Sequence, residues 1–144
     1  MTNIIAIGSD HAGFLLKEAI IGFLEQQGYK VSNKGCYSEE RADYPDFAHE
    51  VAKSVVDQTV NWGILLCGSG NGIAMSANKH KGIRAALCWN SEIASLARQH
   101  NDANILVLPA RFISKEEAFS CIKAFAATTF EGGRHLDRVN KIDL

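Results

Sequence analysis

A chain of 144 residues, 47% of them hydrophobic and 22% charged, has the size and the apolar content of one ordinary globular domain. Its 15 basic and 16 acidic residues give a formal net charge of -1, which leaves no electrostatic case for binding nucleic acid. The apolar runs are far shorter than the about 20 residues of a membrane helix, and the first residues lack the pattern of a signal peptide. We therefore expect a single domain over residues 1–144, cytoplasmic, with no nucleic-acid or membrane partner.

The first half of the chain alternates short apolar runs with amphipathic segments. A strand is predicted over residues 4–8 and a helix over 11–27, where Leu16, Ile20 and Leu24 recur at helical spacing and Gly28 follows. A short strand over 30–32 and a polar loop over 35–44 come next, and Pro45 opens a second helix.

The second half repeats this alternation. Strands are predicted over 62–67, 83–88 and 104–108, and a glycine-rich loop at 68–72 leads into a short helix. A helix capped by Asn90 or Ser91 runs to about residue 100, and Ser114 with Glu117 forms the capping box of another. Residues 131–143 are charged and predicted to be helical in part.

Strands that alternate with helices predict an α/β fold, a three-layer αβα sandwich with a five-stranded parallel, Rossmann-like sheet. Such sheets bind ligands beyond the carboxyl ends of their strands. This rule selects the loops at 9–13, 67–72 and 109–112.

Neither common nucleotide-binding motif is present. The segment 8–13 has the glycine spacing of a Walker A motif, but Phe14 follows Gly13 where lysine is required. In the glycine-rich loop at 68–72, a dinucleotide fingerprint would require glycine or alanine at Ile73. A tight strand-to-helix turn remains an alternative for the loop. A functional interpretation gains support from Cys67, which directly precedes it, because backbone amides at a helix start favour a thiolate, and a thiolate can act as a base or a nucleophile.

The other three cysteines, Cys36, Cys88 and Cys121, lie far apart without metal-ligand spacing. We expect them to be buried apolar residues, and we expect neither a disulfide nor a metal site.

Basic residues near the carboxyl end are candidates for phosphate binding. Arg134 and Arg138 are four residues apart, so on a helix their side chains share one face and suit a phosphate dianion. Arg111 can add a third contact, whereas an exposed tail with ion pairs to Asp137 is the alternative. His100 ends the fourth predicted helix, and a lone histidine in such a place is more often structural than catalytic.

Taken together, seven segments resemble the type B ribose-5-phosphate isomerases, a family that includes galactose-6-phosphate isomerase subunits. They are GSDHAG at 8–13, DYP at 43–45, CGSGNG at 67–72, ANK at 77–79, GIRA at 82–85, RQHND at 98–102 and EGGRH at 131–135.

The resemblance implies an isomerase of the pentose phosphate pathway that interconverts ribose 5-phosphate and ribulose 5-phosphate without cofactor or metal. It implies that Cys67 is the base, that His100 opens the sugar ring and that Asp10 assists. Some members replace this cysteine by a carboxylate further along, but 74–76 offers none here. The implied substrate contacts are Gly68, Ser69, Gly70, Asn71 and Gly72 for the enediolate, Asn101 for the sugar, and His11, Arg111, Arg134 and Arg138 for the phosphate.

Two alternatives stay open: a hexose-6-phosphate isomerase acting on galactose or allose 6-phosphate, and a non-catalytic nucleotide- or flavin-binding module. The predicted topology also places Cys67 and His100 at opposite edges of the sheet. We therefore expect a homodimer with shared active sites, with a tetramer of such dimers left open.

Overall fold

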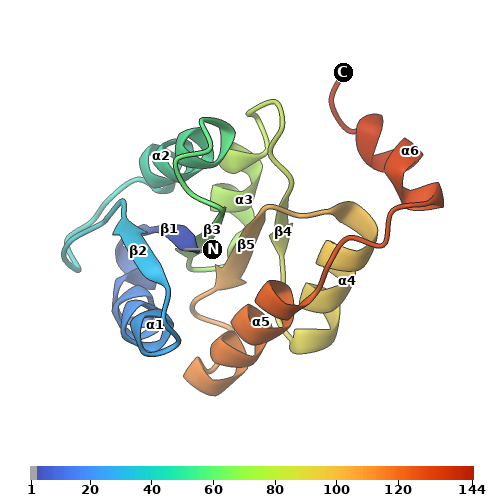
Figure 1. Cartoon of the computed structure of the whole chain (residues 1–144). Helices are drawn as coiled ribbons and strands as arrows, with labels where there is room; N and C mark the ends of the chain where they lie inside the picture. The colour runs from blue at the N-terminus through green and yellow to red at the C-terminus, as the bar shows by residue number, and fades with distance from the viewer. Residues whose placement is uncertain (1–2) are drawn as a thin grey trace.

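The computed structural model describes residues 3–144 and contains one parallel five-stranded sheet in the order β2-β1-β3-β5-β4 (Figure 1). The strands are β1 (Ile4–Ser9), β2 (Lys30–Asn33), β3 (Trp62–Cys67), β4 (Ala85–Leu87) and β5 (Ile105–Pro109). The helices are α1 (Phe14–Gln26), α2 (Tyr44–Val56), α3 (Asn71–Ala77), α4 (Ser91–Asn101), α5 (Lys115–Ala127) and α6 (Arg134–Asn140).

Helices cover both faces of this sheet, which confirms the predicted three-layer sandwich. Side chains of β3 alternate between the two faces, as they must in a strand. Ile64 and Leu66 pack in the core under α1, α4 and α5, whereas Leu65 and Cys67 pack in the core under α2 and α3. No helix within residues 3–144 has the length and apolar character needed to cross a membrane.

Two predicted element boundaries shift for local reasons, and the structure decides between the two caps predicted for one helix. The Asp10 side chain accepts hydrogen bonds from the N–H groups of Ala12 and Gly13 and caps a 3-10 turn over His11–Gly13, so α1 begins at Phe14. Asn90 rather than Ser91 caps α4, because its Oδ1 accepts from the N–H of Ile93 at 3.0 Å. The strand predicted over 83–88 is only Ala85–Leu87, since β4 is an edge strand that pairs with β5 alone.

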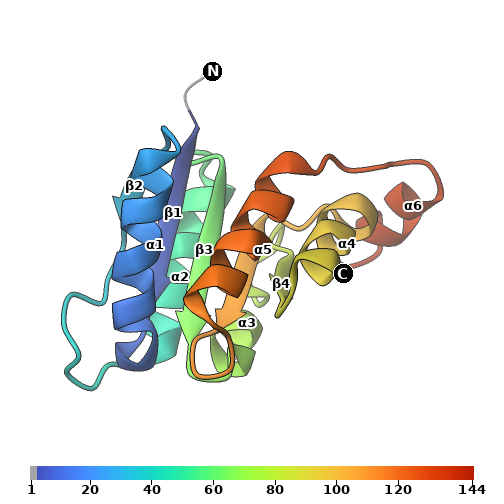
Figure 2. The same cartoon turned by 90° about the horizontal axis from the view of Figure 1, so that it is seen from below.

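The segment after α5 leaves the sandwich. Figures 1 and 2 both show α6 at the end of the molecule, beyond β4 and next to α4, where it packs. The partly helical segment predicted over residues 131–143 is thus confirmed, with its helix at Arg134–Asn140.

Candidate active site

Three loops meet at the carboxyl edge of the sheet, after the adjacent central strands β1, β3 and β5. The N–H of Asp10 donates to the carbonyl of Leu66 at 3.3 Å, which ties the loop after β1 to β3. The N–H groups of Ala110 and Arg111 donate to the carbonyls of Cys67 and Gly68 at 2.9 and 3.0 Å, which ties the loop after β5 to the glycine-rich loop. These are the three loops that the sequence predicts.

Cys67 is the last residue of β3, is buried, and directly precedes the glycine-rich loop. Gly70 has a φ of +81°, in the left-handed region that favours glycine, and it caps α3. This turn sends the chain from β3 into α3 within four residues, so the amides of the loop follow directly after Cys67 in the chain.

Two side chains close over this loop. A Cβ placed on Gly68 would lie 3.3 Å from Nη1 of Arg111, so that guanidinium group lies against the loop. A Cβ placed on Gly72 would lie 2.5 Å from the ring of Tyr44, the first residue of α2. Tyr44 belongs to a segment that carries the family resemblance, but sequence reasoning assigns it no role, since only the folded chain brings α2 to the loop.

His11 faces the loop that precedes α2. Its Nδ1 lies 3.2 Å from both the amide nitrogen and the carbonyl oxygen of Ala42. Either hydrogen bond fixes the ring and leaves Nε2 as the nitrogen not engaged by this loop. Asp10, His11, Cys67, the glycine-rich loop 68–72 and Arg111 therefore form one group of candidate residues, which we call the carboxyl-edge group.

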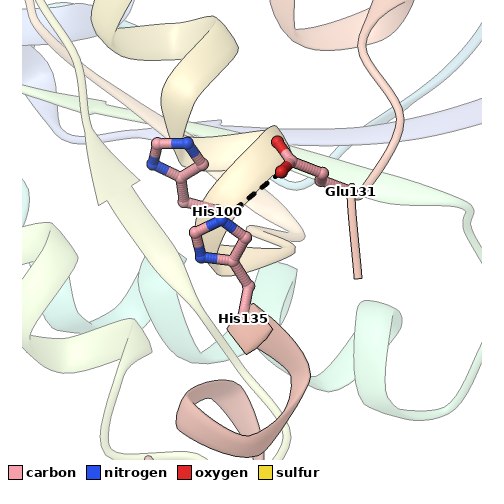
Figure 3. Close-up of side chains that lie close together, drawn as sticks. All are labelled: His100, Glu131 and His135. Atoms are coloured by element: carbon pink, nitrogen blue, oxygen red, sulfur yellow. Dashed lines mark ion pairs between the residues drawn. The ribbon is translucent and has the colours of Figure 1, made fainter. Parts of the chain in front are cut away.

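The remaining candidates lie elsewhere. His100 and Asn101 end α4, while Arg134 and Arg138 are exposed on α6. The ring of His100 stacks on that of His135, with centroids 4.4 Å apart and planes inclined by 13° (Figure 3). These four candidates and His135 form a second group, which we call the α4–α6 group.

The topology separates the two groups within one chain. The carbonyl of Asn104, three residues after α4, accepts from the N–H of Gly63 near the start of β3, so α4 ends at the amino edge of the sheet. Cys67 is at the other end of this strand of 6 residues. At about 3.3 Å per residue, the strand separates its ends by roughly 16 Å.

Histidines supply two features that the sequence did not predict. His135, between the two arginines, is buried, and its pKa is lowered by burial and by the positive charges of His100, Arg134 and Arg138, although Glu131 opposes this.

His49 of α2 and His80, just after α3, are close neighbours, with Nδ1 of the first 2.7 Å from Nε2 of the second. Neither contact has a signal in the sequence, because the partners are 31 to 35 residues apart.

The remaining cysteines are buried, as the sequence predicts. Cys36, Cys88 and Cys121 are buried and free. Burial raises the pKa of Cys88 to about 12 and that of Cys121 to about 11, with smaller contributions from Cys121 and Glu117 respectively. The thiols of Cys88 and Cys121 are thus kept neutral, as suits residues of the core.

Comparison with known proteins adds independent information. Residues 5–142 match the family described as Ribose/Galactose Isomerase. The ribose-5-phosphate isomerase B of Escherichia coli (strain K12) is 46% identical over 138 residues, which are 96% of this chain and 93% of that protein.

Solved structures agree with this match. A ribose 5-phosphate isomerase from Thermotoga maritima superimposes with a TM-score of 0.98 at 50% identity, covering 99% of each chain. The isomerase B of Mycoplasma genitalium, solved with bound ribulose-5-phosphate, gives 0.94 at 43% identity over 99% of this chain and 95% of that one.

Proposed function

The chain belongs to the ribose/galactose isomerase family, and we propose that it is an aldose-ketose isomerase that interconverts ribose 5-phosphate and ribulose 5-phosphate. The observation that carries the proposal is the position of Cys67. This residue ends a central strand directly before the glycine-rich loop, with Asp10 and Arg111 on the neighbouring loops. A base, a set of amide donors and a cation for the phosphate thus meet at one edge of the sheet.

The proposed chemistry moves one proton between two carbon atoms and one between two oxygen atoms. The Cys67 thiolate removes the proton from C2 of the open-chain aldose, and the C–H electrons form the C1–C2 double bond as the carbonyl electrons move to O1. The amides of residues 68–72 stabilise the resulting enediolate, a role worth about 10²–10³ in rate for a single donor in other enzymes. Return of the proton from the thiol to C1, with transfer of the hydroxyl proton from O2 to O1, completes the ketose.

The other candidates prepare the substrate. His100 opens the furanose ring by moving a proton between O1 and the ring oxygen, with Asp10 at the sugar end. Asn101 contacts the sugar, and His11, Arg111, Arg134 and Arg138 hold the phosphate. In this scheme the chain is a single isomerase domain whose segment 131–144 contributes to the phosphate site, and two copies share each active site as a homodimer.

A hexose 6-phosphate is the second candidate substrate. The family description names galactose as well as ribose, so galactose 6-phosphate is the natural comparison. The chain carries Cys67, His100 and both α6 arginines together, which favours an enzyme that needs no second kind of subunit. The family resemblance implies a place in the pentose phosphate pathway, and we infer a cytoplasmic location from the sequence alone.

Ketose formation from ribose 5-phosphate in the presence of EDTA tests the proposal. We expect activity in the wild type and a loss of at least about 10²-fold in Cys67→Ala, as is typical when a general base is removed. Cys121→Ala, which alters a cysteine buried in the opposite core, is the matched control and should retain activity. If the wild type is active only on galactose or allose 6-phosphate, the substrate is that hexose phosphate and not ribose 5-phosphate. If Cys67→Ala retains full activity, Cys67 is not the base.

A further inference from the structure

Three potential metal ligands converge where α6 meets α4. His100 comes from the end of α4, His135 from the first turn of α6, and Glu131 from the segment between α5 and α6 (Figure 3). One ligand atom of each residue lies within 4.8 Å of the others. Two imidazoles and one carboxylate are a ligand set that zinc accepts in proteins.

The buried ring of His135 gives independent support. Its side chain is only 7% exposed, and Nε2 has no hydrogen-bond partner among residues 3–144. The nearest carboxylate oxygen, Oε1 of Glu131, is 3.8 Å away, which is too far for a hydrogen bond. Because buried polar atoms nearly always have a partner, this nitrogen points to a ligand that approaches from the side of Glu131.

The backbone holds the three residues in place. The N–H of Glu131 donates to the carbonyl of Gln99 at 3.0 Å, and the N–H of His135 donates to the carbonyl of Gly132 at 3.1 Å. Between Glu131 and His135 the chain turns at two glycines with positive φ, Gly132 at 72° and Gly133 at 57°. The fold therefore fixes the backbone position from which the exposed Glu131 side chain extends toward the two rings.

We propose that His100, Glu131 and His135 form a binding site for one divalent transition-metal ion, with Zn²⁺ as the best match, and that metal bound there inhibits the enzyme. Ligand atoms on a tetrahedral zinc ion are about 3.4 Å apart, so the group must contract slightly. The nearly parallel rings must also tilt, which the partly exposed His100 can do by rotation about its Cβ–Cγ bond.

Inhibition follows from the use of His100. The inhibitory half of the proposal rests on the proposed function, in which His100 opens the sugar ring, because a nitrogen bound to zinc cannot exchange a proton. The charges of Arg134 and Arg138 on α6 oppose a cation. Metal binding is accordingly reversible and weaker than in a structural zinc site.

Calorimetric titration of the metal-stripped full-length protein with zinc sulfate tests the site directly. The reference protein carries His80→Gln, which removes the separate His49–His80 pair as a second binding site, and Cys67→Ser, which removes a competing thiol. We expect one zinc ion per chain and an affinity at least about 10-fold lower after Glu131→Gln or His135→Gln, the scale seen even for residues that only support metal ligands.

If the buried His135 cannot be substituted without unfolding the protein, Glu131→Gln alone still tests the site. The Glu131 side chain is 53% exposed, so its substitution should leave the protein folded. Circular dichroism checks that each variant is folded. Zinc affinity that neither substitution alters would overturn the site.

Activity measured with added zinc tests the inhibition separately, each protein being compared with its own activity in EDTA. Reversible inhibition of the wild type that is weakened in Glu131→Gln supports the proposal. Stoichiometric zinc binding with undiminished activity overturns the inhibitory half. A protein inactive on every sugar phosphate, even in EDTA, overturns the proposed function and with it the inhibitory half, while the calorimetric result still decides whether the metal site exists.

Discussion

Gly70 is the residue whose backbone most clearly decides the shape of the candidate site. Its φ of +81° lies in the left-handed region, and a Cβ there would collide with Cδ1 of Leu87. Gly70→Ala therefore carries a left-handed penalty of about 1–2 kcal/mol, and the terminal Cδ1 of Leu87 must also move aside. We expect Gly70→Ala to be destabilised in urea unfolding and to lose isomerase activity, because the amides above Cys67 shift.

Gly22→Ala is the matched control for this prediction. Gly22 lies inside α1, where an added Cβ meets no atom within 4 Å. Alanine in the interior of a helix is about 0.5–1 kcal/mol more favourable than glycine, so this variant should be slightly stabilised and fully active. Equal behaviour of the two variants would contradict the role assigned to Gly70.

For single residues, the sequence predicts which side chains carry chemistry better than it predicts which side chains lie in contact. Cys67 is identifiable because a purely structural role rarely requires a thiol at the end of a strand, directly before a glycine-rich loop. Tyr44 and His135 receive no role from the sequence, although each lies beside candidate residues. Their positions depend on packing between helices, which residue spacing within one helix does not reveal.

Among the elements, α1 contains a buried charge that its pattern does not predict. The side chain of Lys17 is fully buried, and its Nζ donates to Oδ1 of Asn33 and pairs with Oε1 of Glu18, both at 3.1 Å. The same Asn33 oxygen accepts from the N–H of Gly35 at 3.0 Å. Asn33 thus joins the end of β2, α1 and the following loop.

Asn33→Ala should destabilise the protein by about 1–3 kcal/mol, the cost of leaving buried donors without an acceptor. Lys17→Met, which removes the charge while keeping an unbranched side chain, should cost less, because an apolar replacement leaves no unpaired charge. Urea unfolding measures both. A smaller loss for Asn33→Ala than for Lys17→Met would show that Asn33 is not the important partner.

The contact between α2 and the turn after α3 should depend on pH. Burial and the charge of His49 lower the pKa of His80 from 6.5, so the native state favours the neutral ring. The native state then binds fewer protons than the unfolded state, and the contribution of His80 to stability is present above pH 6.5 and is lost as the pH falls.

We therefore expect His80→Gln to destabilise the protein more at about pH 8 than at about pH 5. Thermal unfolding of the wild type and the variant across this range measures the difference. A difference in melting temperature that does not change with pH would show that the 2.7 Å contact with His49 does not depend on a neutral His80.

Element boundaries show where prediction from sequence ends. Long periodic segments such as α1 and buried runs such as β3 are predicted within a few residues, because apolar spacing reports burial. β4 is predicted too long, since Ile83 and Cys88 are buried without belonging to the strand. The 3-10 turn after β1 depends on the Asp10 side chain, which competes locally with helical hydrogen bonds.

Over the whole molecule, the separation of the carboxyl-edge group from the α4–α6 group is the feature with the largest consequence. The sequence already predicts it, because a helix that follows a parallel strand must run back across the sheet. The surface adds support for pairing of two copies. Met75, Trp89 and Phe112 follow the carboxyl ends of β3, β4 and β5 and are exposed large apolar side chains.

Mixing two inactive variants tests whether two copies share each active site. In a symmetric dimer of Cys67→Ala with His100→Ala, one site carries both substitutions and the other carries neither. Random exchange makes half of all dimers mixed, so the mixture should recover about a quarter of wild-type activity. Native mass spectrometry verifies the exchange, and mixing Cys67→Ala with the double variant, which should recover nothing, is the control. If mixed dimers form and stay inactive, Cys67 and His100 do not work across the interface, and one chain must bring them together by a rearrangement of α4 and α6.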